Sequence, residues 1–221
     1  MRIRHDHDGS PPQTRLFQSQ GEMSHMGLPQ RVADLTSAEY LKIERAASYR
    51  NEYFRGQMFA MAGGSARHSR IKTNVLSYLN GRLKGQPCST YDSDLRIKCP
   101  TGLYTYPDAS VLCGELEFDD EHKDTVLNPT LLVEVLSKST EAYDRGKKFD
   151  HYRTIPSLRE YVLVSQDEPM VQRFVRNDDD TWTLSAVSNL DQATLLSSIG
   201  IDLPLAEVYE RVDFTPEDVS T

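Results

Sequence analysis

The sequence predicts an α/β fold with a mixed sheet, in the order helix, three strands, helix, strand. Runs rich in β-branched and aromatic residues alternate with segments whose apolar residues recur every 3.6 positions. The run from Thr130 to Leu136 is apolar except at Glu134, which is typical of a central strand covered on both faces. A helix joins this run to the next strand, so the two strands are expected to be parallel. A helix and hairpin precede this core, and a hairpin and helix follow it.

Thr36-Ser37-Ala38-Glu39 matches a capping box and predicts a helix to about Ala47. Two short strands are then expected within 52–61, around a turn at Gly56. Gly63-Gly64-Ser65 ends this pattern and caps a longer helix. The apolar residues that give this helix its period are Ile71, Val75, Leu76, Leu79 and Leu83.

Strands are predicted at 90–98, 104–113 and 130–136, with a helix from Ser139 or Thr140 to about Arg153. Another central strand follows at 160–164. The segments 170–176 and 181–187 predict a hairpin, and 205–209 predicts a last helix.

The ordered part of the chain is expected to be one domain, 34–214. Residues 1–33 are polar and without apolar periodicity, so we expect an unstructured tail or an extension upstream of the native start. A weak metal-binding role for His5-Asp6-His7-Asp8 is the less favoured interpretation. Residues 215–221 are expected to be a flexible C-terminus.

Composition narrows the class of protein. The net charge of -8 disfavours a generic nucleic-acid binder, but clustered catalytic carboxylates would also produce it in an enzyme that acts on nucleic acid. No apolar run reaches the roughly 18 residues of a membrane span, so we expect no membrane partner and a cytoplasmic location. Cys88, Cys99 and Cys113 lack CxxC spacing and are interpreted as small buried hydrophobes, without a disulfide or a zinc site.

Two carboxylates carry the chemical prediction. Asp108 follows Pro107 at the entry of a strand, and Glu134 lies inside one. If the strands pair, both side chains can meet on one face and hold one or two magnesium ions. The alternatives are a turn aspartate at position 108 and a buried salt bridge to an arginine at Glu134.

Lys148 is predicted to assist this pair, because it lies on the helix that leaves the strand of Glu134. Asp144, Lys148 and Tyr152 are four residues apart and share a helix face, whereas Lys147 is expected to face solvent. Lys148 could orient a water or stabilise developing negative charge. A surface ion pair with Asp144 is the alternative, nearly as well supported.

Four further residues are candidates around this site. Glu52 could supply a third carboxylate, and His68 a polar contact to a ligand. Arg67 and Arg70 could contact phosphate. An exposed glutamate, a structural histidine and solvated arginines are the alternatives.

Together these motifs resemble the Uma family, bacterial proteins described as putative restriction endonucleases and a branch of the PD-(D/E)XK nuclease superfamily. The likeness extends over about 34–214. Its motifs are Asn51-Glu52-Tyr53, Arg67-His68, Tyr106-Pro107-Asp108, Val133-Glu134-Val135-Leu136-Ser137, Tyr143-Asp144-Arg145-Gly146-Lys147-Lys148-Phe149 and Leu158-Arg159-Glu160-Tyr161.

The resemblance implies a restriction-endonuclease-like core and metal-dependent DNA cleavage, with Asp108 and Glu134 as ligands of Mg or Mn. The superfamily pattern has a lysine two residues after the glutamate, where this chain has Leu136. The resemblance places the basic role on the following helix, at Lys148.

The leading hypothesis is therefore a magnesium-dependent DNA endonuclease that acts as a homodimer. A catalytically silent nuclease-fold module that binds DNA or a partner is the second. A hydrolase of RNA or small phosphoesters is the third.

Overall fold

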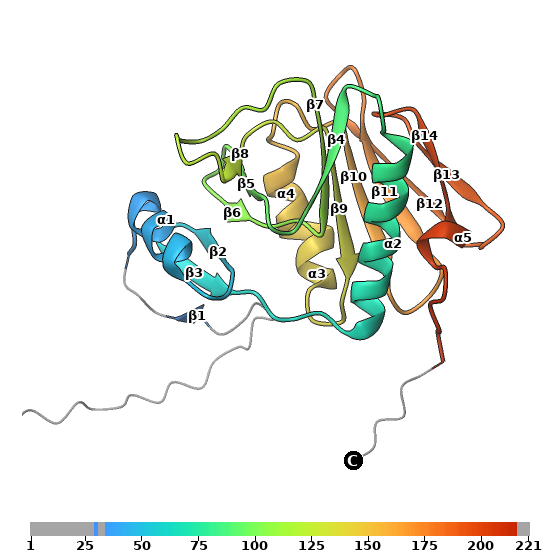
Figure 1. The fold of residues 1–221 in the computed structure, drawn as a ribbon, viewed down its shortest axis with the longest axis horizontal. Coiled ribbons are helices and arrows are strands. Elements are labelled where there is room, and N and C mark those ends of the chain that lie inside the picture. Colours follow the sequence, from blue (N-terminus) through green and yellow to red (C-terminus); the bar gives the residue numbers. More distant parts are fainter. Residues whose placement is uncertain (1–28, 31–33, 216–221) are drawn as a thin grey trace, which may run out of the picture.

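The protein is described here by a computed structural model covering residues 29–30 and 34–215. It contains two six-stranded sheets and a two-stranded hairpin (Figure 1). We call the sheet with the longer strands the larger sheet and the other the smaller sheet. The larger sheet has the order β12-β11-β10-β9-β7-β4. Its strands are β4 (Cys88–Asp92), β7 (Ala109–Cys113), β9 (Leu131–Leu136), β10 (Glu160–Ser165), β11 (Val171–Arg176) and β12 (Trp182–Val187).

The central strands β9 and β10 are parallel and every residue of both is buried, while the other pairs of this sheet are antiparallel. The predicted mixed sheet and parallel crossover are therefore confirmed. On one face, alternate β9 residues such as Val133 pack under α2 (Ala66–Arg82) and α5 (Leu205–Val208). On the other face, residues such as Leu132 pack with Tyr152 and Tyr161.

The second face is covered by a helical segment that begins close to the predicted cap. It consists of α3 (Glu141–Tyr143), the π-helical turn η1 (Asp144–Lys148) and α4 (Phe149–Tyr152). The sequence predicted a continuous helix but not its π turn, which widens the spiral where Asp144 and Lys148 point inward.

The smaller sheet has the order β1-β3-β2-β6-β5-β8 and packs against α1 (Ser37–Ala46). Its strands are β1 (Pro29–Gln30), β2 (Asn51–Phe54), β3 (Gln57–Ala60), β5 (Arg96–Lys98), β6 (Tyr104–Thr105) and β8 (Thr125–Val126). The capping box of α1 is confirmed, because Thr36 and Glu39 bond reciprocally. Arg55 and Gly56 both have positive φ, which is the geometry of a two-residue hairpin turn.

Two predicted strands are wrong in extent, because each is divided between the two sheets. The segment 90–98 turns at Asp92–Asp94 from β4 to β5, where Asp94 N–H bonds to the Asp92 carboxylate. The segment 104–113 turns at Pro107, which has no N–H to donate to a ladder. The sequence also missed β13 (Ala193–Leu196) and β14 (Ile201–Pro204).

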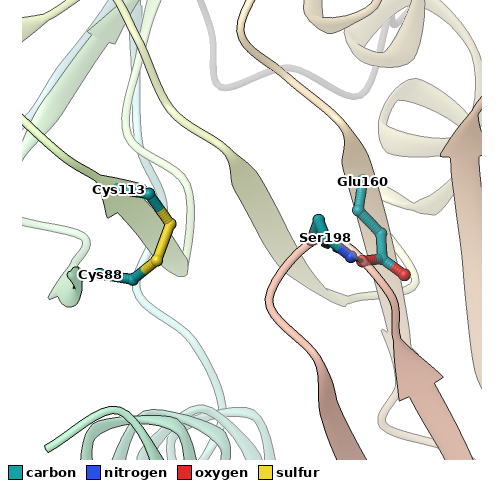
Figure 2. The surroundings of a disulfide bond; sticks show 4 residues. All are labelled: Cys88, Cys113, Glu160 and Ser198. Carbon is teal, nitrogen blue, oxygen red and sulfur yellow. Dashed lines mark hydrogen bonds between the residues drawn. A yellow bond between two sulfur atoms is a disulfide. The ribbon is translucent and has the colours of Figure 1, made fainter. Parts of the chain in front are cut away.

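The interpretation of all cysteines as free is also wrong. Cys88 and Cys113 are directly paired across β4 and β7 and form a disulfide, whereas Cys99 is free and buried (Figure 2). The same view shows Glu160 beside Ser198, whose N–H and hydroxyl both donate to it. These bonds fix the turn between β13 and β14 against the start of β10.

The expectation of an unstructured N-terminal segment is wrong at Pro29–Gln30, which pairs with β3. The remainder of 1–33, including the His5–Asp8 string, and residues 216–221 lie outside the described part of the chain. Within the described residues, no helix has the length and apolar character needed to cross a membrane.

Candidate active site

Asp108 and Glu134 lie near the same end of the β7–β9 pair. Asp108 immediately precedes β7, whose first residue, Ala109, pairs with Val133 of β9. Val135 N–H donates to Asp108 Oδ2 at 2.8 Å, which anchors the aspartate beside β9. The structure thus places Asp108 next to the strand residue that follows Glu134.

Lys148 reaches the same point from η1. Its Nζ lies 2.8 Å from Glu134 Oε1 and 3.4 Å from Glu52 Oε1. Asp144 Oδ1, one turn earlier, is 3.5 Å from the same nitrogen. All four residues are at most 7% exposed. Lys148 is therefore part of a buried cluster and makes no surface ion pair.

The predicted face of the helical segment is the one that faces the site. Tyr152 O–H donates to Glu134 Oε1 at 2.8 Å, and Tyr161 O–H on β10 donates to the Asp144 carbonyl at 3.0 Å. Lys147 is exposed, as the 100° turn between neighbouring helix positions predicts. The β10 tyrosine thus anchors η1 to the larger sheet.

Glu52 enters the site from the smaller sheet. On β2 it points opposite to Tyr53, which packs under α1, and the Thr105 hydroxyl of β6 donates to its Oε1. The cluster therefore lies between the two sheets, and the bends that divide the two predicted strands create this position.

His68 contacts Asp108 from the first turns of α2. Its Nε2 is 3.2 Å from Asp108 Oδ2. A Cβ added at Gly64 would lie 2.6 Å from His68 Nδ1, so the absence of a side chain there makes room for the ring. This contact agrees with the position expected for a residue that orients a ligand.

The two arginines next to His68 differ. Arg67 is engaged by the main-chain oxygens of Gln166 and Thr215, and its Nη1 is 3.8 Å from Asp167. Arg70 is exposed. The structure therefore commits Arg67 to protein contacts and leaves Arg70 at the surface.

The cluster carries more negative than positive charge. Burial, together with Asp144 and Asp108, raises the pKa of Glu134 to about 8 against the opposing effect of Lys148. Burial likewise raises the pKa of Asp144. For Lys148, burial lowers the pKa, but Glu134, Tyr152, Glu52 and Asp144 outweigh it and hold it well above the usual value. At neutral pH the cluster retains a proton on its carboxylates, centred on Glu134.

The carboxylate oxygens of Asp108 and Glu134 are chemically suited to bind a hard divalent cation. Carboxylate oxygens are the ligands that Mg²⁺ prefers, and a cation would offset the excess charge. Asp108 Oδ1 and Glu134 Oε2 make no hydrogen bond among the described residues, so each carboxylate keeps one oxygen for a ligand. In the part of the chain that the structure describes, however, no three His, Cys, Asp or Glu side chains converge closely enough to hold a metal by themselves. Water and substrate oxygens would complete the coordination, as is usual for Mg²⁺.

Sequence reasoning gave no site role to three residues of this neighbourhood, namely Thr105, Tyr161 and Gly64. Thr105 lies in a strand and carries no signal, because hydroxyl-bearing residues are common there. Tyr161 stood in one of the motifs of the family resemblance, but its contact with Asp144 could not be inferred from that motif. The adjacent Gly63 and Gly64 did carry a signal, although it was interpreted only as a helix boundary.

The chain matches one family model and two proteins of similar sequence. The family model Uma2, described as putative restriction endonuclease, matches residues 37–206. Over 181 residues the chain is 38% identical to the uncharacterized protein slr1290 of Synechocystis sp.. The aligned residues are 81% of this chain and 94% of that protein. The uncharacterized protein sll1609 of the same organism is 36% identical over 152 residues, which are 68% of this chain and 86% of that protein.

A solved structure shares the fold. It is the crystal structure of a putative nuclease belonging to DUF820 from Anabaena variabilis, with a TM-score of 0.66 and 19% sequence identity. The match covers 79% of this chain and 97% of that one. At this identity the likeness establishes the fold.

Proposed function

Because this chain belongs to the Uma2 family of putative restriction endonucleases, we propose that it is a metal-dependent endonuclease that hydrolyses phosphodiester bonds of DNA. The observation that carries the proposal is the buried cluster of Glu52, Glu134, Asp144 and Lys148, with Asp108 bonded to the N–H of the neighbouring Val135. Burying several carboxylates around one lysine is unfavourable for a structural network. It is suited to a site that binds a cation and an anionic substrate together.

In this proposal Asp108 and Glu134 hold Mg²⁺ or Mn²⁺, with Glu52 as a further carboxylate. The metal, when bound, supplies an activated water and neutralises charge on the phosphodiester. Lys148 then turns from Glu134 towards a phosphate oxygen, where it stabilises the charge that develops during attack.

Other side chains position these groups. Tyr152 holds Glu134 Oε1 in place, and Asp144 keeps the ammonium of Lys148 inside the cluster. His68 and Val135 N–H together fix Asp108 through one oxygen, which leaves the other to face a ligand. Each would act on the reaction through its neighbour.

The biological setting is proposed with the function. We propose DNA as the substrate, a cytoplasmic location, and a homodimer that would address both strands. The family supports a nucleic-acid substrate.

Plasmid nicking with Mg²⁺ or Mn²⁺ tests the proposal. Asp108→Ala and Glu134→Ala should each lower cleavage at least 100-fold, while Asp178→Ala, which alters an exposed carboxylate, should not. Nicking by both site variants at the wild-type rate would contradict the assignment. Mg²⁺ should also raise the melting temperature of wild type more than that of Glu134→Ala, since a ligand that binds only the folded state stabilises it.

Lys148 has a matched control in its neighbour. Lys148→Met should abolish cleavage, whereas Lys147→Met changes an exposed side chain and should leave it intact. Because Lys148→Met also removes a buried charge, its folding is checked by circular dichroism. A folded Lys148→Met protein with normal cleavage would remove the lysine from the mechanism.

One observation favours a second function, a catalytically silent module that binds DNA or a partner. The ammonium of Lys148 already lies 2.8 Å from Glu134 Oε1, where it offsets negative charge that a metal ion would otherwise offset. Salt-sensitive DNA binding without metal-dependent cutting would support this alternative. Cleavage of RNA or a small phosphodiester in preference to DNA would instead change the substrate class.

A further inference from the structure

A cavity of about 260 Å³ lies on the α1 side of the smaller sheet, outside the acid cluster. Glu44, Arg96 and Tyr106 form its inner wall, and Tyr49, Arg50 and Asp94 form its rim. A volume of this size equals about nine water molecules and admits one heteroaromatic ring.

The inner wall is rigid and has its polar groups satisfied. Tyr106 O–H donates to Glu44 Oε1 at 2.9 Å, and Arg96 Nη1 donates to the Tyr106 oxygen at 2.8 Å. Asn51 donates to both oxygens of Glu44. Such a network preorganises a surface, and the proposed hydrolysis makes no use of it.

The rim is exposed and carries unused binding capacity. Tyr49 is half exposed, and Arg50 reaches Asp94 through only one nitrogen of its guanidinium. Both partners of that pair are exposed, so the contact is weak and easily exchanged. The charged groups of the lining comprise three carboxylates and three guanidinium groups. A lining with balanced charge and both donors and acceptors suits a neutral polar ring better than a bare phosphate.

Lys72 supplies a cation next to this rim. It follows His68 by one turn of α2, and its Nζ donates to Ser93, the residue before Asp94, at 3.2 Å. Among the described residues it makes no ion pair, although it is half buried. Lys72 thus lies between Ser93, which precedes the rim residue Asp94, and His68, one helical turn earlier, which contacts Asp108.

We propose that this cavity and Lys72 form a nucleotide subsite of the DNA substrate, with an unstacked base on Tyr49 and its phosphate on Lys72. The inference rests on the proposed function, because it assigns a binding place to that same substrate. Tyr106 lies two residues, or at most about 7 Å of chain, from Asp108. The subsite would therefore hold a nucleotide close to the scissile bond.

The experiment measures binding, without cleavage, of a fluorescein-labelled single-stranded DNA oligonucleotide to the full chain in EDTA, by anisotropy at several salt concentrations. Tyr49→Ala should weaken binding at least about fivefold with an unchanged salt slope, and Tyr49→Phe should retain it. Lys72→Ala should reduce the salt slope by about 0.7, the value for one phosphate contact to single-stranded DNA. Lys84→Ala, which alters an exposed lysine beyond the far end of α2, serves as the control.

Each other outcome overturns the subsite. Wild-type affinity and slope in Tyr49→Ala and Lys72→Ala, or no binding by wild type, would refute it. An effect of Lys72→Ala alone would reduce it to a phosphate contact and refute the base position. These readings need no cleavage, so they are independent of Asp108→Ala nicking. Loss of nicking in Asp108→Ala with unaltered binding in Tyr49→Ala would leave the endonuclease standing without this subsite. Thermal unfolding of each variant verifies that it is folded.

Discussion

Replacing Glu134 by glutamine should stabilise the metal-free protein while removing its proposed activity. The amide keeps the size of the side chain and can still accept bonds from Tyr152 and Lys148. It is neutral without taking up a proton, and Glu52 and Asp144 remain to pair with the lysine. The variant therefore avoids the free-energy cost of protonating Glu134 on folding at neutral pH.

The magnitude follows from the pKa of Glu134. Burial raises it from 4.5 to about 8. Between these values the folded state binds more protons than the unfolded state, so stability falls as pH rises and the loss is complete above the folded pKa. Each pH unit above 4.5 corresponds to about 1.4 kcal/mol, which gives on the order of 3 kcal/mol at pH 7 and under about 1 kcal/mol at pH 5.

Urea unfolding in EDTA measures this difference. At pH 7, Glu134→Gln should have a free energy of unfolding higher than wild type by up to that amount, and the gap should nearly close at pH 5. Glu141→Gln is the matched control, because Glu141 is an exposed partner of Arg145 and should change stability by less than about 0.5 kcal/mol. A Glu134→Gln protein less stable than wild type at pH 7 would refute the reasoning, since it would show that Lys148 stabilises the ionised glutamate.

Two further predictions follow from contacts around the site and the sheet. Gly64→Ala should lower the free energy of unfolding by about 1–3 kcal/mol and reduce nicking, because its Cβ would lie 2.6 Å from His68. Gly63→Ala is the control, since its Cβ meets nothing within 4 Å and it should be neutral in both assays. Equal behaviour of the two variants would contradict the packing argument. Reduction of the Cys88–Cys113 disulfide should lower the free energy of unfolding by about 3 kcal/mol, as expected for a loop of 25 residues. Urea unfolding with and without dithiothreitol measures this effect, and an unchanged midpoint would show that the bond contributes nothing.

Most of the elements could be predicted from local pattern. The capping box at Thr36, the period of α2 and the apolar run of β9 each depend on neighbouring residues only. The division of 90–98 and 104–113 between two sheets was missed, because alternation of apolar residues says nothing about which sheet a strand joins. Asp92–Asp94 and Pro107 were the available turn signals.

The candidate site was found for a different reason. A glutamate inside an apolar run and a lysine at the right helix spacing are anomalies that a sequence shows directly, and the structure places both in one cluster. The pairing of Cys88 with Cys113 depends on strand register, and their separation along the chain contains no information about it. The hydroxyl of Thr105 reaches Glu52 only because two sheets meet, which again is a long-range property.

The position of Glu134 explains why its charge cannot be relieved locally. All six residues of β9 are buried, and Val133 and Val135 on either side pack into the opposite core. Moving the carboxylate to water would therefore expose a central strand, at far greater free-energy cost than the repulsion itself. Only a proton, Lys148 or an added cation can compensate it where it stands. A single lysine cannot neutralise all the carboxylates around it. In the metal-free protein a bound proton offsets the remaining negative charge, and a divalent ion would offset it in the proposed reaction.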